Sequence, residues 1–410
     1  MKKLLLVLLI LSLFINHLNA NEKDLNIIQK DKKEYRLLEK ESIQTRQQSQ
    51  KYDWISPIDL SGNIGRNHSF SDENSRNLNN KNTKSASIGF TQSIFESGGI
   101  GFKMDYADNR FKYEMLSWEN QNSQLIYTIY NTLLDIKKLK LEINQNDYRI
   151  VNKDIELIIK KIQYEAGKTD IIELNNAIMS KNLIQKEEIA LKNSLKEKEQ
   201  ELAKYTDLKY DEIEILDFQE TNKDIFLDKN YSILEADAKV EMLNSEYKIK
   251  KSQYLPKLSL SAKASYSNQD EKFNSMINDT NKDDATSSGS LILTMPLYDY
   301  TKSSKIQESK IEVLKQKALV NDLKNETAFE YEQIFTKIDT FLKQNETINK
   351  NIKLYEELIG ANKISSEAGM TSKYDLEILE NTKTINEFDI LINKINILQQ
   401  YAKLYFKIKN

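Results

Sequence analysis

The clearest pattern in the chain is a heptad repeat of apolar residues between Tyr300 and Ile359. Seven of the eight residues spaced seven apart from Ile306 to Tyr355 are apolar, with Thr327 the exception. A second row consists of Tyr331, Ile338, Asn345, Ile352 and Ile359 and is interrupted by the polar Asn345. Rows that alternate four and three residues apart are typical of a helix packed in a left-handed coiled coil. No Pro or Gly interrupts the stretch, so at about 1.5 Å per residue the predicted helix is roughly 90 Å long.

The same pattern occurs about 202 residues earlier, which indicates a tandem duplication. Ile306, Val313 and Val320 correspond to Met104, Phe111 and Trp118, and the second row corresponds to Ile129, Ile136, Ile143, Ile150 and Leu157. An internal repeat defines the architecture before single residues are interpreted. We predict a first structural repeat over 21–205 and a second over 230–410, joined by a linker over 206–229.

Each repeat is predicted to contain a helix, a β-hairpin, a long helix and a return helix. In the first repeat these last three lie at about 56–96, 99–163 and 171–205, and in the second at about 257–298, 299–361 and 373–408. The first helix of each repeat ends before a proline, Pro57 or Pro256, as a helix that gives way to an extended element does. Gly167 and Gly369 close the long helices, because glycine takes the left-handed conformation at a helix C-terminus without strain. These two glycines therefore mark helix-turn tips, and the short connections predict antiparallel helical hairpins.

After each of these prolines the hydrophobic period changes to two, which is the period of a half-exposed strand. The polar stretches from His68 to Lys84 and from Ser267 to Ser288 are predicted to be solvent loops. Two hairpins with one apolar face fit a small soluble β-subdomain, although this would be marginal alone in water. They also fit a membrane barrel, whose strands need about 9–11 residues. Four strands cannot close a barrel, whereas three chains would supply twelve.

The N-terminus has the features of a secretory signal peptide over residues 1–20. Lys2 and Lys3 precede an apolar run from Leu4 to Ile15, and Ala20 is the predicted cleavage position. A retained membrane anchor is the alternative, but the run of about 12 residues is shorter than the ~20 that span a bilayer. No Cys follows the signal, so lipid attachment through an N-terminal Cys is excluded.

Composition excludes several other classes of protein. Charged residues are 30% and mean hydropathy is −0.61, which is not the composition of a helical membrane protein. Net charge is −3, and loss of Lys2 and Lys3 with the signal would make it −5, so nothing points to nucleic acid. Cys is zero and the mature chain has one His, His68, which disfavours zinc sites and His-based triads. We identify no catalytic, cofactor-binding or metal-binding residues and expect no enzyme activity.

Three short motifs carry a resemblance to a known family. Tyr254–Leu258 joins a helix to a strand, and Pro296–Asp299 joins the second hairpin to the long helix, with Ile94–Gly99 as its first-repeat partner. Tyr164–Gly167 lies at a helix turn and recurs as Ser366–Gly369. In their order and spacing these motifs resemble the outer membrane efflux protein family, the TolC-like channels, over nearly all of the mature chain.

The resemblance implies a mainly α-helical homotrimer with a β-barrel portion. Four strands per subunit would form a 12-stranded barrel in the outer-membrane lipid, and the helices would continue it as a periplasmic α-helical duct. Such proteins are passive exit ducts of tripartite efflux or type I secretion systems, and their partners are a periplasmic adaptor and an inner-membrane transporter. The outer-membrane component is similar in systems that export drugs, metals or proteins, so the resemblance does not identify the cargo.

The resemblance also implies candidate residues for a periplasmic constriction. Asp375 and, in the first repeat, Glu173 align with acidic positions of the family, six residues after Gly369 and Gly167 respectively. The second acidic position of the family falls on Ile378, with Glu377 as the acidic neighbour. The other interpretation is an exposed carboxylate in the first turn of a helix, where negative charge is favourable. The family's Tyr and Arg links at this end correspond here to Ser366 and Thr371, which cannot form those bonds.

Aromatic residues near the predicted strand ends fit two interpretations, an aromatic belt at a membrane interface or ordinary strand packing. They are Trp54, Phe90, Phe95, Tyr266, Tyr298 and Tyr300. For the whole chain, the alternative to an outer-membrane duct is a secreted or periplasmic coiled-coil scaffold or adaptor, with the hairpins as soluble tips.

Overall fold

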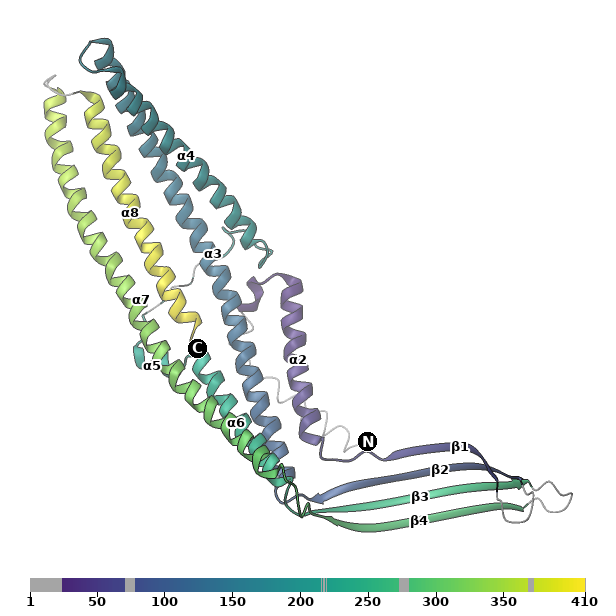
Figure 1. Ribbon diagram of the computed structural model, residues 1–410. Helices are drawn as coiled ribbons and strands as arrows, with labels where there is room; N and C mark the ends of the chain where they lie inside the picture. The colour runs from purple at the N-terminus through teal and green to yellow at the C-terminus, as the bar shows by residue number, and fades with distance from the viewer. Residues whose placement is uncertain are drawn as a thin grey trace, which may run out of the picture. The chain divides into compact units, whose positions relative to one another are not determined.

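The computed structural model describes residues 24–70, 78–214, 216, 218, 220–272, 280–367 and 372–409. The predicted signal peptide and Gly369 lie outside these residues. The elements follow one another as a duplicated series of helix, hairpin, long helix and return helix (Figure 1). Their bounds are η1 (Asp24–Ile27), α2 (Lys30–Tyr52), β1 (Asp59–Phe70), β2 (Leu78–Phe95), α3 (Gly99–Glu165), α4 (Ile171–Leu202), α5 (Lys223–Asp228), α6 (Tyr231–Ser252), β3 (Lys257–Lys272), β4 (Thr280–Thr294), α7 (Lys302–Glu367) and α8 (Lys373–Phe406). The prediction of a mainly helical fold with a small β portion is confirmed.

The heptad pattern marks the buried side of α7. Val313, Val320, Ile334 and Ile338 are all buried, and the polar exception Thr327 is buried with them. Farther along α7 the same rows are half-buried. There the second polar exception, Asn345, accepts a hydrogen bond from Asn393 of α8 at 2.9 Å. The heptad positions therefore lie on the side of α7 that packs against other helices. The polar residue Asn345 within this pattern has a hydrogen-bond partner on the neighbouring helix.

Two boundaries of the second long helix differ from the prediction. It begins at Lys302 rather than at 299 because Asp299 forms a capping turn, in which its carboxylate accepts from the backbone N–H and the hydroxyl of Thr301, both at 2.7 Å. It continues to Glu367 rather than ending near 361. Gly360 lies inside the helix, where it costs about 1 kcal/mol relative to Ala, too little to end a helix of this length.

The hairpin strands are longer than predicted. Antiparallel pairing runs from Asp59↔Gly89 to Phe70↔Leu78 in the first hairpin and reaches Glu271↔Thr280 in the second. The polar stretches His68–Lys84 and Ser267–Ser288, predicted to be solvent loops, therefore contribute to strands wherever the structure describes them, and that prediction is wrong. Backbone pairing does not need apolar side chains, so polarity alone could not locate the strand ends.

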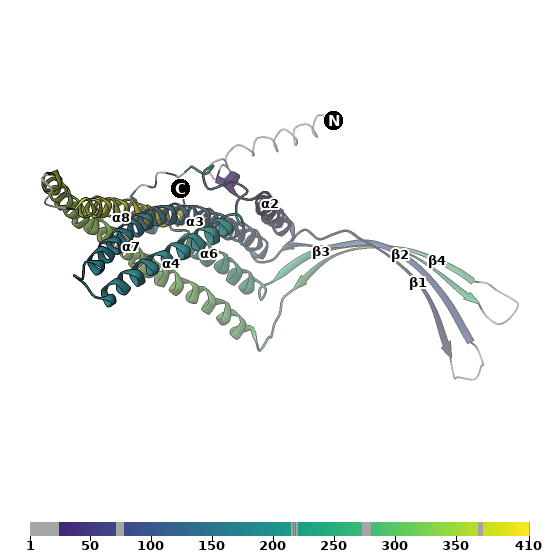
Figure 2. The same ribbon diagram turned by 90° about the horizontal axis from the view of Figure 1, so that it is seen from above.

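The four strands form one antiparallel sheet in the order β1-β2-β3-β4. β2 pairs with β3, so the hairpins of the two repeats join directly. The strands run side by side and curve in the same direction (Figures 1 and 2). A bulge interrupts the β2–β3 register between Ser93 and Phe95, and bulges bend strands locally. β1 and β4 are left as the edges of the sheet.

The chain divides into two compact units that do not follow the repeat boundaries. The first unit combines residues up to 40, 116–235 and residues from 321 onward, and the second combines 41–115 with 236–320. Each unit therefore takes elements from both repeats. A division into repeats at 21–205 and 230–410 describes the duplication in sequence but not the packing.

The predicted linker over 206–229 is partly helical and is anchored in the first unit. It contains α5, whose N-cap Asn222 accepts a hydrogen bond from the backbone of Asp224 at 3.0 Å. Phe226 of α5 is 0% exposed and belongs to a core cluster that also contains Ile334, Ile338, Leu404 and Ile408. Burial of one aromatic side chain gives a helix this short its stability, and the six-residue length hides it from any periodicity test.

The C-terminal end of α8 is held beside this cluster. Ile408 forms a β-bridge with Asn230, and the backbone N–H of Lys409 donates to the carbonyl of Lys229 at 2.8 Å. Glu330 of α7 forms ion pairs with Lys403, at 2.8 Å, and with Lys407. The linker and the chain end are thus fixed to each other and to α7.

Candidate functional site

The sheet has two chemically different faces. Residues paired across an antiparallel sheet point to the same side, so the register places Leu60, Ile88 and Ala264 in one row and Leu260 and Leu291 in another. These two rows share a face, and Ile64 and Leu293 on the same face are 84% and 72% exposed. This apolar face defines the first candidate functional surface, because contiguous exposed apolar area of this kind marks contact with another molecule or with lipid.

The opposite face of the sheet carries hydroxyl groups that bond to one another across the strands. Ser61 and Ser87 lie 2.8 Å apart, and Ser265 and Thr286 lie 2.8 Å apart. Thr91 with Ser261, and Ser93 with Ser259, form further contacts of 3.1 and 3.4 Å. Cross-strand Ser and Thr pairs of this type stabilise a sheet modestly. The hydroxyl face is therefore polar and made of small side chains, which suits contact with water.

A tight crossing leads from the sheet into α3. Ser97 has φ of 51° and Gly98 has φ of 88°, and the hydroxyl of Ser97 donates to the carbonyl of Pro256 at 2.6 Å. Glu96 is buried and its carboxylate pairs with Lys103 of α3 at 2.9 Å. A Cβ on Gly99 would lie 2.9 Å from the hydroxyl of Ser252. The small residues Ser97, Gly98 and Gly99 of the first-repeat motif thus fit a place where this segment closely approaches Ser252 and Pro256 of the second repeat.

The first helix turn, at Gly167, is a Schellman motif. Gly167 has φ of 68°, its N–H donates to the carbonyl of Tyr164 at 2.9 Å, and the N–H of Lys168 donates to that of Gln163 at 2.8 Å. These two bonds satisfy carbonyls at the end of α3 that have no partner within the helix. α4 then begins behind Asp170, whose carboxylate accepts from the N–H of Glu173 at 2.9 Å.

Glu173, a candidate constriction residue, is exposed but already paired. Its carboxylate binds the ammonium of Lys160 on α3 at 2.9 Å. The sequence pattern gave no indication of this pair, because Lys160 lies 13 residues earlier and reaches Glu173 only through the hairpin. A neighbouring cation reduces the negative potential that this carboxylate offers to a mobile ion.

The other two candidate constriction residues lie at the start of α8. Ser372 caps the helix by accepting from the N–H of Tyr374 at 3.2 Å, and Asp375 and Glu377 follow in the first turns, both exposed. Within the described part of the chain, neither carboxylate has an ion-pair partner. The two return helices therefore start differently, with a neutralised carboxylate in the first repeat and two free carboxylates in the second.

Cross-helix ion pairs connect the helices of each hairpin. Asp154 of α3 pairs with Lys181 of α4 at 2.5 Å. Glu356 of α7 pairs with Lys383 of α8 at 2.9 Å, and Lys363 pairs with Glu380 at 3.3 Å. Exposed pairs of this type contribute about 0–1 kcal/mol each and weaken with salt. They favour the antiparallel register of each hairpin without holding it rigidly.

Where α3 of the first repeat meets α8 of the second, several contacts are polar. Gln145 donates to the carbonyl of Ile385 at 2.9 Å and to the carboxylate of Asp389 at 2.7 Å. Asn152, seven residues further along α3, donates to Thr382 at 3.2 Å. Burial raises the pKa of the nearby Glu142 carboxyl, and the negative charge of Asp135 acts in the same direction. Gln145 and Asn152, polar residues seven positions apart on α3, were the only sequence feature that could have indicated this contact between α3 and α8.

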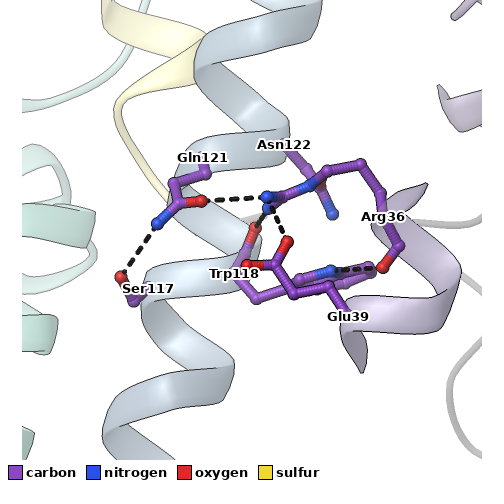
Figure 3. Close-up of polar contacts among 6 residues, drawn as sticks. All are labelled: Arg36, Glu39, Ser117, Trp118, Gln121 and Asn122. Carbon is purple, nitrogen blue, oxygen red and sulfur yellow. Dashed lines mark hydrogen bonds and ion pairs between the residues drawn. The ribbon is translucent and has the colours of Figure 1, made fainter. Parts of the chain in front are cut away.

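The first turns of α2 are fastened to α3 by a buried arginine (Figure 3). Arg36 is 8% exposed, and its guanidinium donates to Asn122 at 2.6 Å, to Gln121 at 2.9 Å and to the carbonyl of Trp118 at 2.9 Å. It also pairs with Glu39 at 2.5 Å, while the indole of Trp118 donates to the carbonyl of Arg36 at 2.8 Å. Burial lowers the pKa of Arg36, opposed by the charge of Glu39, and arginine still remains protonated in proteins.

Among the described helices, none combines the length and the apolar character needed to cross a bilayer.

Comparisons with known proteins agree with this geometry. The sequence profile of the family described as Outer membrane efflux protein matches residues 224–403. No curated protein matches the chain significantly by sequence. The fold is similar to that of solved structures described as outer membrane proteins or channels.

Three of these structures show the extent of the similarity. The outer membrane protein VceC from Vibrio cholerae has a TM-score of 0.70 at 12% identity, covering 90% of this chain and 91% of its own. The CmeC outer membrane channel from Campylobacter jejuni has a TM-score of 0.69 at 13% identity, covering 92% and 84%. The MtrE outer membrane channel from Neisseria gonorrhoeae has a TM-score of 0.65 at 11% identity, covering 91% and 85%. The profile match in the second repeat and the fold shared over about nine-tenths of the chain confirm the resemblance to the outer membrane efflux protein family.

Proposed function

We propose that the protein is a passive exit duct in the bacterial outer membrane that extends into the periplasm. The observation that carries this proposal is the four-stranded sheet with one exposed apolar face and one hydroxyl face. A transmembrane barrel needs this division, since its outer face meets lipid and its inner face meets water. The apolar rows from Leu258 to Tyr266 cover eight residue steps, about 27 Å along the strand. At a strand tilt of about 40° this is about 21 Å along the membrane normal, most of the ~25 Å apolar band of outer-membrane barrels.

The edges of the sheet support a homotrimer. β1 and β4 have no strand partner on their outer sides within the described chain, and unpaired backbone groups are not tolerated in the hydrocarbon region. Pairing of β1 in one copy with β4 in the next removes both edges. Three copies supply the twelve strands that the family resemblance implies, and the curved strands are suited to closure.

The helices would form the periplasmic part of the duct. Asp375 and Glu377 lie at the start of α8 and have no ion-pair partner among the described residues, and we propose them as the acidic ring of the constriction at the helix-turn end. Glu173 would contribute less because Lys160 neutralises it. We propose a periplasmic adaptor and an inner-membrane transporter as partners, in a tripartite efflux or type I secretion system. The signal peptide predicted over 1–20 would direct the chain to export.

The first test is the native mass of the mature protein extracted from isolated outer membranes in mild detergent. A trimer found only with detergent, conducting in planar bilayers, is the expected result. A monomer or dimer that is released without detergent from the periplasm would exclude the duct. That outcome would favour the second candidate, a periplasmic coiled-coil scaffold or adaptor, which the long heptad helices also permit.

A second test addresses the constriction. In planar bilayers, Asp375→Asn combined with Glu377→Gln should lower cation selectivity, since rings of carboxylates attract cations. The control is Glu173→Gln combined with Lys160→Gln, which should change selectivity less because it removes an ion pair with no net charge. Equal effects of the two changes, or none, would reject the assigned roles.

A further inference from the structure

Two basic residues lie on the apolar face of the sheet, at the end that is nearer the hairpin turns. Lys84 of β2 pairs with Ile64 of β1 and with Asn268 of β3, and Arg66 of β1 pairs with Asn82. Their strand positions put both side chains on the same side as Leu60 and Ile88, where apolar residues otherwise predominate. A charge on this side of the sheet needs an explanation, because lysine or arginine is costly at the middle of a lipid-facing surface and much less costly near the interface.

The position along the strands gives part of that explanation. On β3 the apolar face runs upward through Leu258, Leu260, Ala262 and Ala264 to Tyr266, and the next residue on this face is Asn268, in the row of Lys84. Tyr266 marks the boundary, since tyrosine is enriched at the border of lipid and water. Lys84 is thus in the row after Tyr266, a row that also contains Ile64, and Arg66 is in the next row, beyond the last apolar side chain of β3.

The two cations lie close together and have no anion among the described residues. Arg66 and Lys84 are diagonal neighbours on adjacent antiparallel strands, which places them about 7–8 Å apart. Both are exposed, and neither forms an ion pair with another described side chain. Two like charges at this spacing repel each other unless an anion lies between them, and one tetrahedral phosphate has enough acceptor oxygens for both.

Asp283, the acidic residue in the row of Lys84, is hydrogen-bonded to residues of β3. Asp283 of β4 is two strands away from Lys84, and its carboxylate accepts from the hydroxyl of Tyr266 at 3.0 Å and from Asn268 at 2.6 Å. Asp284, the next residue, points to the hydroxyl face by the alternation of the strand. Asp283 is therefore not a partner of the basic pair on β1–β2. Asp270 of β3, which the register puts in the row of Arg66, is not among the residues whose side chains the structure describes.

We propose that Arg66 and Lys84 form a site for the phosphate of an anionic lipid in the outer leaflet. The proposal rests on the proposed function, since it requires that the apolar face meets lipid and that the hairpin turns face away from the periplasm. The lipid's acyl chains would lie along Leu60, Ile64 and Ile88, while its phosphate would bind the guanidinium and the ammonium. In the trimer the site would occur three times, beside the β1 edge where adjacent copies meet.

The test uses the full mature trimer in neutral detergent, mixed with phosphatidylglycerol or with phosphatidylcholine of the same chain length. Native mass spectrometry counts retained lipids, and thermal unfolding reports stabilisation. We expect preferential retention of phosphatidylglycerol and a higher melting temperature with it. Arg66→Gln combined with Lys84→Gln should weaken phosphatidylglycerol binding about thirtyfold, since each basic residue near an anionic headgroup contributes about one kilocalorie per mole.

The control is Lys263→Gln, which removes an exposed lysine from the hydroxyl face of the same sheet. It should leave lipid preference unchanged. Equal retention of both lipids by the wild type, or equal losses in the double variant and the control, would overturn the proposal. Stabilisation by inorganic phosphate alone, at constant ionic strength, would overturn the lipid assignment in favour of a soluble anion.

Failure of this inference can be separated from failure of the proposed function. A conducting trimer with no preference for anionic lipid overturns only the basic site. A protein that needs no detergent and does not conduct overturns both.

Discussion

Arg36 gives the sharpest prediction about the helical part of the structure. Its guanidinium bonds to Asn122, Gln121, Glu39 and the carbonyl of Trp118 in a site that is 8% exposed at the arginine. Arg36→Met keeps the aliphatic stem but leaves those acceptors unpaired. Removing one partner of a buried ion pair costs about 3–5 kcal/mol, and because the side chain of Glu39 is 33% exposed and can rehydrate, we expect about 3 kcal/mol.

The assay is amide hydrogen exchange in residues 33–40 of α2, which reports local opening. A loss of about 3 kcal/mol corresponds to exchange roughly 150 times faster. Arg46→Met, on the same helix, removes an ion pair with Glu114 at 2.9 Å in which the arginine side chain is 44% exposed. A surface pair is worth about 0–1 kcal/mol, so this control should accelerate exchange less than about fivefold. If Arg36→Met also stays within fivefold, then the buried cluster does not hold α2 to α3.

Three further predictions concern the first unit and the helix turns. Phe226→Ala should lower the free energy of unfolding in urea by about 3–5 kcal/mol, since it empties a fully buried position in the core cluster. A change below about 1 kcal/mol would contradict the proposal that Phe226 anchors the segment between the repeats. Gly167→Ala should destabilise by about 1 kcal/mol because φ is 68°, whereas Gly360→Ala, inside α7 with open space at its Cβ, should stabilise by a similar amount; melting temperatures that move in the same direction would refute the argument. Burial raises the pKa of Glu330, but its hydrogen bonds and charge pairing with Lys403 and Lys407 outweigh burial and hold that pKa below its ordinary value. This stabilisation is therefore complete above the unfolded pKa of about 4.3 and is lost as pH falls through the folded pKa. Amide protection at the end of α8, taken relative to the intrinsic exchange rate at each pH, should therefore fall with acidification in the wild type and not in Glu330→Gln.

The long helices could be predicted from sequence because a single physical cause, burial of one side of a helix, produced the pattern. Val313, Val320, Ile334 and Ile338 recur at heptad spacing and are buried in the structure. Strand length could not be predicted in the same way. The outer halves of the strands carry Asn, Asp and Ser, whose polarity indicates exposure to water and says nothing about backbone pairing.

Candidate site residues were only partly predictable for a related reason. The positions of Asp375 and Glu377 in the first turns of α8 follow from local sequence. The neutralisation of Glu173 by Lys160 depends on how a hairpin closes, and the burial of Arg36 depends on contacts with residues more than 80 positions away. Such pairings leave no periodic trace, since each one involves a single residue on each helix.

The two repeats are joined by contacts within each packing unit. β2 of the first repeat pairs with β3 of the second, and α3 of the first repeat donates hydrogen bonds to α8 of the second. Residues 206–229, which join the repeats, are themselves anchored by Phe226 and by the bridge that follows at Asn230. The second repeat could not bury Ile334 and Ile338 in the same way alone, since they belong to a cluster with Phe226 of the connecting segment. A protein cut between the repeats would therefore be expected to regain its fold only when both halves are present together, with each half supplying two strands to the sheet and one long helix to the bundle.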